Sequence, residues 1–175
     1  MEPLDLYSRA SEWTAGLVRG SADQLGAATP CDEWDVRSLI SHMIDTQHYF
    51  ASKARGQDAP LPRPMPPDLV GDDPVTAYDH ARSDTLRAFG EPDGIEKAGM
   101  GVGIAFSDAL LHGWDLAVAT RQDATMPDGL AQAAFDTIHG QFTPEQRQGV
   151  FKPEVKVGDD ATPQQKLLAY TGRTL

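Results

Sequence analysis

The chain has 175 residues, of which 40% are hydrophobic and 23% charged, a composition typical of one globular domain. Its net charge of −11 argues against a nucleic-acid partner, which needs a basic face to neutralise phosphates. The same charge argues against docking on an anionic membrane surface.

Location is indicated by the single cysteine and by the N-terminus. Cys31 cannot form an internal disulfide, so a reducing cytosol is the natural compartment. The N-terminal segment carries charges where a signal peptide needs an apolar run. We find no apolar stretch that approaches the roughly 20 residues needed to span a bilayer. The sequence therefore predicts one cytoplasmic domain over residues 1–175.

Apolar periodicity predicts two helices in the first third of the chain. Pro3 opens the first, whose apolar residues recur at intervals of three and four toward Leu25. Asp35 is the expected N-cap of the second, because its carboxylate can accept the unpaired amides of a first turn. This second helix is expected to end near Gly56.

A proline-rich segment, residues 57–73, follows and predicts a long connection, because proline has no amide donor to sustain a helix. Long loops in compact domains are often functional. Asp73 and Pro74 then form a helix start, a cap residue followed by proline at the first helical position. We expect this third helix to reach Phe89, and we expect residues 94–103 to form a glycine-rich loop.

The remaining sequence predicts three further helices, over residues 104–121, 129–141 and 163–170, with a short strand-like piece at residues 154–157. Four substantial amphipathic helices predict an all-α fold, a four-helix bundle. The proline-rich connection suits a bundle with a crossover between helices.

The residues most suggestive of chemistry lie on two of these helices. Asp108 and His112 are four residues apart and therefore share one helix face, and Asp115 follows on the same side. His42, in the second helix, lies beside Leu39 at the edge of the apolar stripe. An imidazole and a carboxylate at this spacing can reach one cation, with a third ligand from a neighbouring helix. Two nitrogens and one oxygen suit Zn²⁺, Ni²⁺ or Fe²⁺, leaving positions open to water or substrate.

An alternative interpretation of the Asp108–His112 spacing is a solvent-exposed pair worth a few tenths of a kcal/mol. Against it, Leu110 and Trp114 indicate a largely buried helix, and a buried carboxylate needs partners. Asp115 either orients His112 by accepting its second N–H or reaches solvent. No catalytic base is evident.

The other candidate side chains favour structural roles. We expect Cys31 to be a buried, inert thiol, because no histidine neighbours it in the sequence. Trp34 and Trp114 are expected in the core. The other three histidines are expected to be structural or exposed: His48, His80 and His139.

Three blocks of sequence resemble a known family: TPCDEWDVRSLISH at residues 29–42, DALLHGWDLAVAT at 108–120 and ATPQQKLLAYTGR at 161–173. Together they are similar to the actinobacterial branch of the DinB/YfiT-like metalloenzymes. The best-understood relative in that branch is the N-terminal domain of mycothiol-dependent maleylpyruvate isomerase. The blocks span nearly the whole chain and occur in the family's order.

The resemblance implies an up-down-down-up bundle with a divalent metal at its open end. The family's first ligand, after the Trp-x-Val-Arg-x-Leu motif, falls on His42, and the later pair falls on Asp108 and His112. Zn²⁺ is the metal expected first, with Ni²⁺ or Fe²⁺ as alternatives, and mycothiol is the implied thiol cosubstrate. The isomerase has glutamate at the position of Asp108 and a second domain without a counterpart here, so its substrate contacts cannot be transferred.

Two functions from different classes follow. The first is a metal-dependent enzyme that acts with a low-molecular-weight thiol on a small electrophile, by transfer or isomerisation. The second is a non-catalytic metal-binding bundle, or one that pairs into a homodimer through an apolar face. Neither function requires a nucleic acid or a membrane.

Overall fold

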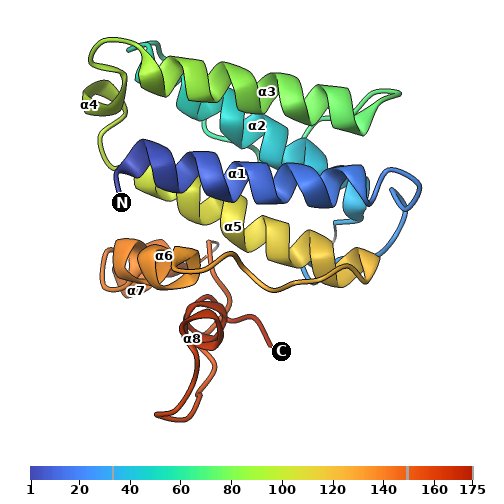
Figure 1. Ribbon diagram of the computed structural model, residues 1–175, viewed down its shortest axis with the longest axis vertical. Helices are drawn as coiled ribbons and strands as arrows, with labels where there is room; N and C mark the ends of the chain where they lie inside the picture. The colour runs from blue at the N-terminus through green and yellow to red at the C-terminus, as the bar shows by residue number, and fades with distance from the viewer. Residues whose placement is uncertain (33, 149, 175) are drawn as a thin grey trace. The chain divides into compact units, whose positions relative to one another are not determined.

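The computed structural model describes residues 1–32, 34–148 and 150–174 (Figure 1). It divides into two compact units, Met1–Thr125 and Met126–Leu175. Within the described residues there is no strand, only an isolated antiparallel bridge between Ala28 and Asp35. The predicted all-α fold is therefore confirmed, while one domain over residues 1–175 stays a prediction.

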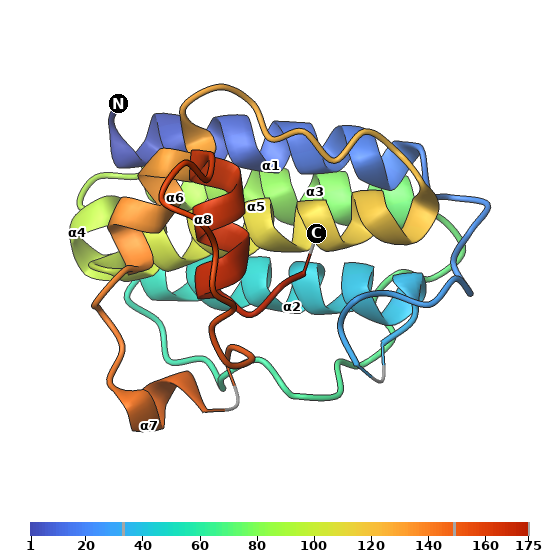
Figure 2. The same cartoon turned by 90° about the horizontal axis from the view of Figure 1, so that it is seen from below.

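The first unit is built on four long helices and one short one. Their bounds are α1 (Pro3–Arg19), α2 (Val36–Ala54), α3 (Pro74–Gly90), α4 (Gly94–Ala98) and α5 (Gly101–Thr120). α1 packs against α3 and α5, and α2 packs against the same two helices. Followed by colour in Figure 2, α1 and α5 run one way and α2 and α3 the other, which is the expected up-down-down-up order.

The parallel course of α2 and α3 depends on the proline-rich connection, which returns along the length of the bundle (Figure 2). Its contacts with α2 hold it in place. The Leu69 amide donates to Ser41 Oγ at 3.1 Å, and Arg37 pairs with Asp68 at 3.0 Å. The connection is thus a fixed part of the surface that covers one end of α2.

Close packing of α1 on α5 sets the position of the helix that carries Asp108 and His112. The Thr14 hydroxyl donates to Ala109 O across the interface at 2.9 Å. Gly113 lies at the closest approach, where a Cβ would come within 2.5 Å of Thr14 Oγ1. A hydrogen bond and a missing side chain together fix the separation of these two helices.

Several helix boundaries follow the predicted signals. The Asp35 carboxylate accepts the Ser38 amide at 2.8 Å and caps α2. The Asp73 carboxylate accepts the amides of Val75 and Thr76 and caps α3.

Other boundaries differ from the predictions. α1 ends at Arg19 instead of near Leu25, because Gly20 closes it and turns follow. Residues 94–103 are not a loop: they hold α4 and the first turn of α5, separated at Gly99, whose φ of 55° breaks the helix.

The second unit contains α6 (Leu130–Ile138), α7 (Pro144–Arg147) and α8 (Pro163–Tyr170). α6 packs against α8. The short α7 was not expected. The strand-like piece predicted at residues 154–157 is wrong, since this segment is irregular and shows one backbone bond, from the Val155 amide to Ala169 O at 2.9 Å. An isolated segment without a pairing strand has no ladder to join.

α5 is also the one helix among the described residues that is long and apolar enough to cross a membrane, with a mean hydropathy of 1.2. This corrects the expectation that no apolar stretch reaches that length. Of the most apolar 18-residue stretch of this helix, 67% is buried inside the protein, as is typical of a core helix. Its apolar character is therefore explained by packing within the bundle.

Candidate metal centre

α2 and α5 bring His42, Asp108 and His112 together at their shared interface. Asp108 Oδ1 lies 3.7 Å from His42 Nε2 and 3.5 Å from His112 Nε2. One ligand atom from each of the three residues lies within 4.8 Å of the others. The structure thus gathers the three residues that the sequence singled out, while the metal itself stays a prediction.

These separations fit a shared cation better than direct hydrogen bonds. A good N–H···O bond spans about 2.7–3.2 Å, and both contacts to Asp108 are longer. Two ligands about 2.1 Å from a tetrahedral ion lie about 3.4 Å apart. The donor set of two imidazole nitrogens and one carboxylate oxygen also matches the ligands that Zn²⁺ and its neighbours accept.

Electrostatics in this cluster favour positive charge. Burial opposes ionisation of Asp108, but the nearby His112, with a smaller contribution from His42, outweighs it and holds the pKa of the carboxyl well below its usual range. Burial likewise opposes protonation of His112, yet Asp108, with smaller contributions from Asp115 and Cys31, raises its pKa well above the usual value. A carboxylate that stays ionised when buried is suited to bind a cation.

Asp115 lies directly behind His112. Its side chain is 1% exposed, and its Oδ2 lies 3.0 Å from His112 Nδ1. A carboxylate can only accept, so Nδ1 carries a proton that is donated to Asp115, and Nε2 is the ring nitrogen that lies toward Asp108. The sequence left two alternatives for Asp115, contact with His112 or with solvent. In the structure its carboxylate contacts His112.

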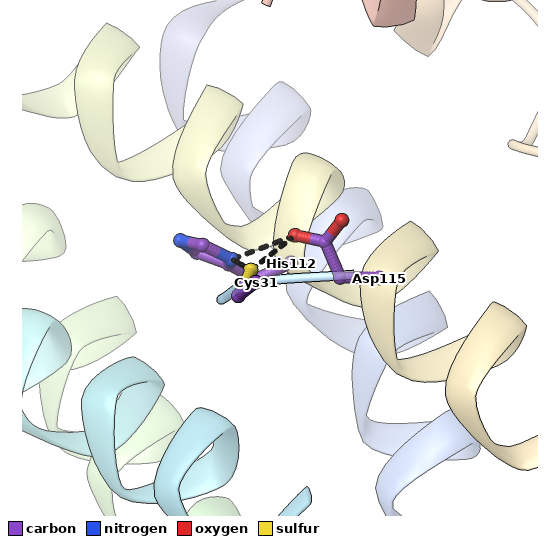
Figure 3. Close-up of side chains that lie close together, drawn as sticks. All are labelled: Cys31, His112 and Asp115. Atoms are coloured by element: carbon purple, nitrogen blue, oxygen red, sulfur yellow. Dashed lines mark hydrogen bonds and ion pairs between the residues drawn. The ribbon is translucent and has the colours of Figure 1, made fainter. Parts of the chain in front are cut away.

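Cys31 belongs to the same cluster, which the sequence did not indicate (Figure 3). Its thiol donates to Asp115 Oδ2 at 3.3 Å and lies 3.9 Å from His112 Nδ1. It is partly exposed instead of buried. No histidine neighbours Cys31 in the sequence, but His112, 81 residues further along the chain, lies beside it in the structure. The expected full burial is therefore wrong, while the expected inertness of the thiol stays a prediction. The one available signal was that Cys31 shares a sequence block with His42.

Trp34 is partly buried, packs against the core as expected and also lies against the two histidines. Its ring centroid is 4.5 Å from that of His42 and 6.0 Å from that of His112. The indole Nε1 donates to Pro64 O at 3.1 Å, which ties the ring to the proline-rich connection. The indole therefore packs against both imidazoles on one side of the cluster.

Other candidate residues lie outside the cluster. His48, His80 and His139 are exposed, and Trp114 is buried, all as expected.

The fold and the site define a helical bundle with a candidate metal centre between two of its helices. The family described as mycothiol maleylpyruvate isomerase N-terminal domain matches residues 7–117, a range that contains His42, Asp108, His112 and Asp115. The chain belongs to this family.

Two curated relatives match the whole chain over their own whole length with 31% identity. They are the uncharacterized protein MT0763 of Mycobacterium tuberculosis strain CDC 1551 / Oshkosh and the uncharacterized protein Rv0738 of strain ATCC 25618 / H37Rv. No solved structure matches the chain at a significant level.

Proposed function

We propose that this protein is a metal-dependent enzyme that acts with a low-molecular-weight thiol of the mycothiol type on a small electrophile, by thiol transfer or by thiol-assisted isomerisation. The observation that carries the proposal is the convergence of His42 Nε2, Asp108 Oδ1 and His112 Nε2 within 4.8 Å. The family's name supplies the thiol. Reduced thiols of this kind are cytoplasmic, which agrees with the location expected from the single cysteine.

His42, Asp108 and His112 would hold the metal, with Zn²⁺ expected first and Ni²⁺ or Fe²⁺ as alternatives. A bound divalent ion would keep the cosubstrate thiol as its thiolate at neutral pH. Three protein ligands leave a position for that sulfur.

The surrounding residues would orient and shield the ligands. Asp115 would fix the tautomer of His112, and its buried charge adds to that of Asp108 to balance a divalent ion. Trp34 would restrict water at the open side. Within the described part of the chain, the buried His42 Nδ1 has no hydrogen-bond partner, so packing against Trp34 and the contact of Thr46 Oγ1 with Nε2 at 3.4 Å orient that ring.

Metal content of the whole chain, purified without an affinity tag, tests the proposal. We expect close to one equivalent of a transition metal and a rise in melting temperature on adding Zn²⁺ or Ni²⁺, because native-state ligands stabilise by mass action. Less than about 0.2 metal per chain with no thermal shift would contradict it.

Catalysis is tested separately, with mycothiol and a chromogenic arylating electrophile. We expect His42→Ala to abolish the metal-stimulated conversion of the electrophile in the presence of mycothiol, whether or not the thiol is consumed. His48→Ala, which replaces an exposed histidine on the same helix, should retain this conversion. Full activity in a folded His42→Ala variant would contradict the assigned role.

The second candidate is a non-catalytic metal-binding or dimerising bundle. The aspartate at position 108 favours this second candidate, because the isomerase that the chain resembles has the longer glutamate at this ligand position. This candidate predicts a metal-loaded protein, monomeric or dimeric by light scattering, that neither consumes mycothiol nor converts any electrophile offered with it.

A further inference from the structure

The imidazole of His112 has two ring nitrogens that can bind a cation, and only Nε2 lies toward His42 and Asp108. The opposite edge of the ring, which carries Nδ1, is the second face of His112. Figure 3 shows Cys31 and Asp115 gathered at the Nδ1 atom, with the other ring nitrogen pointing away from them. Cys31 Sγ, His112 Nδ1 and one Asp115 oxygen all lie within 4.8 Å of one another. The second face therefore has its own set of three donor atoms.

We propose that this second face is a soft-metal site, in which Cys31 Sγ, His112 Nδ1 and Asp115 Oδ2 bind one thiophilic divalent cation of the Cd²⁺ or Zn²⁺ class. Sulfur, nitrogen and oxygen donors together select such ions over Mg²⁺ or Ca²⁺. The site does not depend on the proposed enzymatic function, although the two share His112.

The turn before α2 holds Cys31 in place before any ion arrives. Thr29 Oγ1 accepts the Cys31 amide at 3.2 Å and donates to the Trp34 carbonyl at 2.8 Å. The Trp34 amide donates back to Cys31 O at 3.2 Å. Asp115 and His112, three residues apart on α5, supply the other two donors from one rigid helix face. A site held by such a turn and one helix loses little conformational entropy on binding.

Binding would release two protons, one from the Cys31 thiol and one from His112 Nδ1. The neutral ring then carries its proton on Nε2, where it points toward Asp108 at 3.5 Å. Binding at Nε2 requires the opposite tautomer, with Nδ1–H donated to Asp115. One neutral imidazole can serve only one face at a time, so the two sites exclude each other.

Titration of the reduced, metal-stripped whole chain with Cd²⁺ tests the site through ultraviolet sulfur-to-cadmium charge-transfer absorption. We expect saturation at one equivalent in the wild type and no band in Cys31→Ser. Asp115→Asn should raise the apparent Kd for Cd²⁺ at least about tenfold. His42→Ala, which removes the other site, should retain the band, as should the surface control His48→Ala.

Cadmium-113 NMR of the wild type avoids any dependence on variant folding. We expect correlations from the ion to the Cys31 β protons and to the His112 ring. Correlations to the His42 ring without Cys31 would overturn the proposal, as would an unchanged Kd in a folded Asp115→Asn variant. Ni²⁺ binding to Cys31→Ser, followed as a thermal shift, separates the two claims: its loss contradicts the proposed function, and a missing cadmium band in the wild type contradicts only this site.

Discussion

Asp108 is the residue on which the candidate metal centre depends most, because both histidines approach the same carboxylate oxygen. We predict that Asp108→Asn weakens Zn²⁺ binding at least about tenfold, since it removes the ligand's charge. Asp108→Glu should still bind Zn²⁺, because the isomerase that this chain resembles has glutamate at this position. Competition with a chromogenic chelator measures both affinities.

The matched control for this prediction is Asp45→Asn, a carboxylate on α2 that lies outside the cluster. It should bind Zn²⁺ like the wild type. Equal affinity in a folded Asp108→Asn variant would show that the ion binds elsewhere.

Asp115 acts through His112 and calls for a different readout. Asp115→Asn leaves a group that can donate to Nδ1 and so permits the unproductive tautomer. We predict Ni²⁺ affinity about 10–100-fold lower than in the wild type. Ni²⁺ is the suitable ion because it reports on the Nε2 face. An unchanged Ni²⁺ affinity would mean that Asp115 only fills space.

At the residue scale, the sequence could predict the ligands that local geometry relates. Asp108 and His112 are a helical turn apart, so periodicity alone places them on one face. The contacts of Cys31 and Trp34 with His112 could not be predicted, because they depend on a turn held by Thr29 and join residues some 80 positions apart. Spacing carries no information of that kind.

Among the elements, the α1–α5 interface has little room for added volume. A Cβ at Gly113 would come within 2.5 Å of Thr14 Oγ1 and 2.6 Å of the Trp13 ring. We predict that Gly113→Ala lowers the free energy of unfolding by about 1–3 kcal/mol, because the helices must separate. Urea denaturation measures the change.

Gly16→Ala is the control for this substitution, since the nearest atom to its Cβ is 3.9 Å away. It should stabilise α1 by about 0.5–1 kcal/mol through helix propensity. Destabilisation by both variants would point to a general intolerance of alanine instead of a close approach.

Arg55, at the end of α2, links this helix to α3. It donates to both oxygens of Asp84 at 2.9 Å, and hydrogen bonds from Arg55 and Arg87 lower the pKa of Asp84 to about 2. A carboxyl group whose pKa is lowered by folding stabilises the folded state at pH values above the pKa of the same group in the unfolded chain. This stability is lost as the pH falls toward 2. Because the pair is partly exposed, we predict that Asp84→Asn costs about 1 kcal/mol at pH 7.

The pH dependence distinguishes this pair from a packing effect. The stability difference between wild type and Asp84→Asn should shrink as the pH falls from 4 toward 2. The exposed loop variant Asp58→Asn should match the wild type throughout. A difference that stays constant with pH would contradict the electrostatic origin.

Helix ends were predictable where a side chain caps them. Asp35 and Asp73 mark their helices in the sequence and cap them in the structure. The loop predicted at residues 94–103 failed because glycine content alone does not reveal where backbone torsions break a helix. Only Gly99 adopts a left-handed φ there, so α5 begins three residues earlier than expected.

Over the whole molecule, the candidate centre lies entirely within one of the two compact units. The ligands, Asp115 and Cys31 all belong to Met1–Thr125, as does the apolar cluster around Leu39 and Leu116. We predict that a fragment of residues 1–125 remains helical by circular dichroism and binds Zn²⁺. An unfolded fragment would favour the single domain over residues 1–175 that the sequence predicts.

The central claim is that His42, Asp108 and His112 bind one transition-metal ion. Anomalous scattering at the zinc and nickel edges, from crystals of tag-free protein, tests it most directly. We predict one anomalous peak within bonding distance of His42 Nε2, Asp108 Oδ1 and His112 Nε2, with at least one coordination position open. An absent peak after soaking with Zn²⁺ and Ni²⁺, or a peak that none of these three atoms contacts, would contradict it.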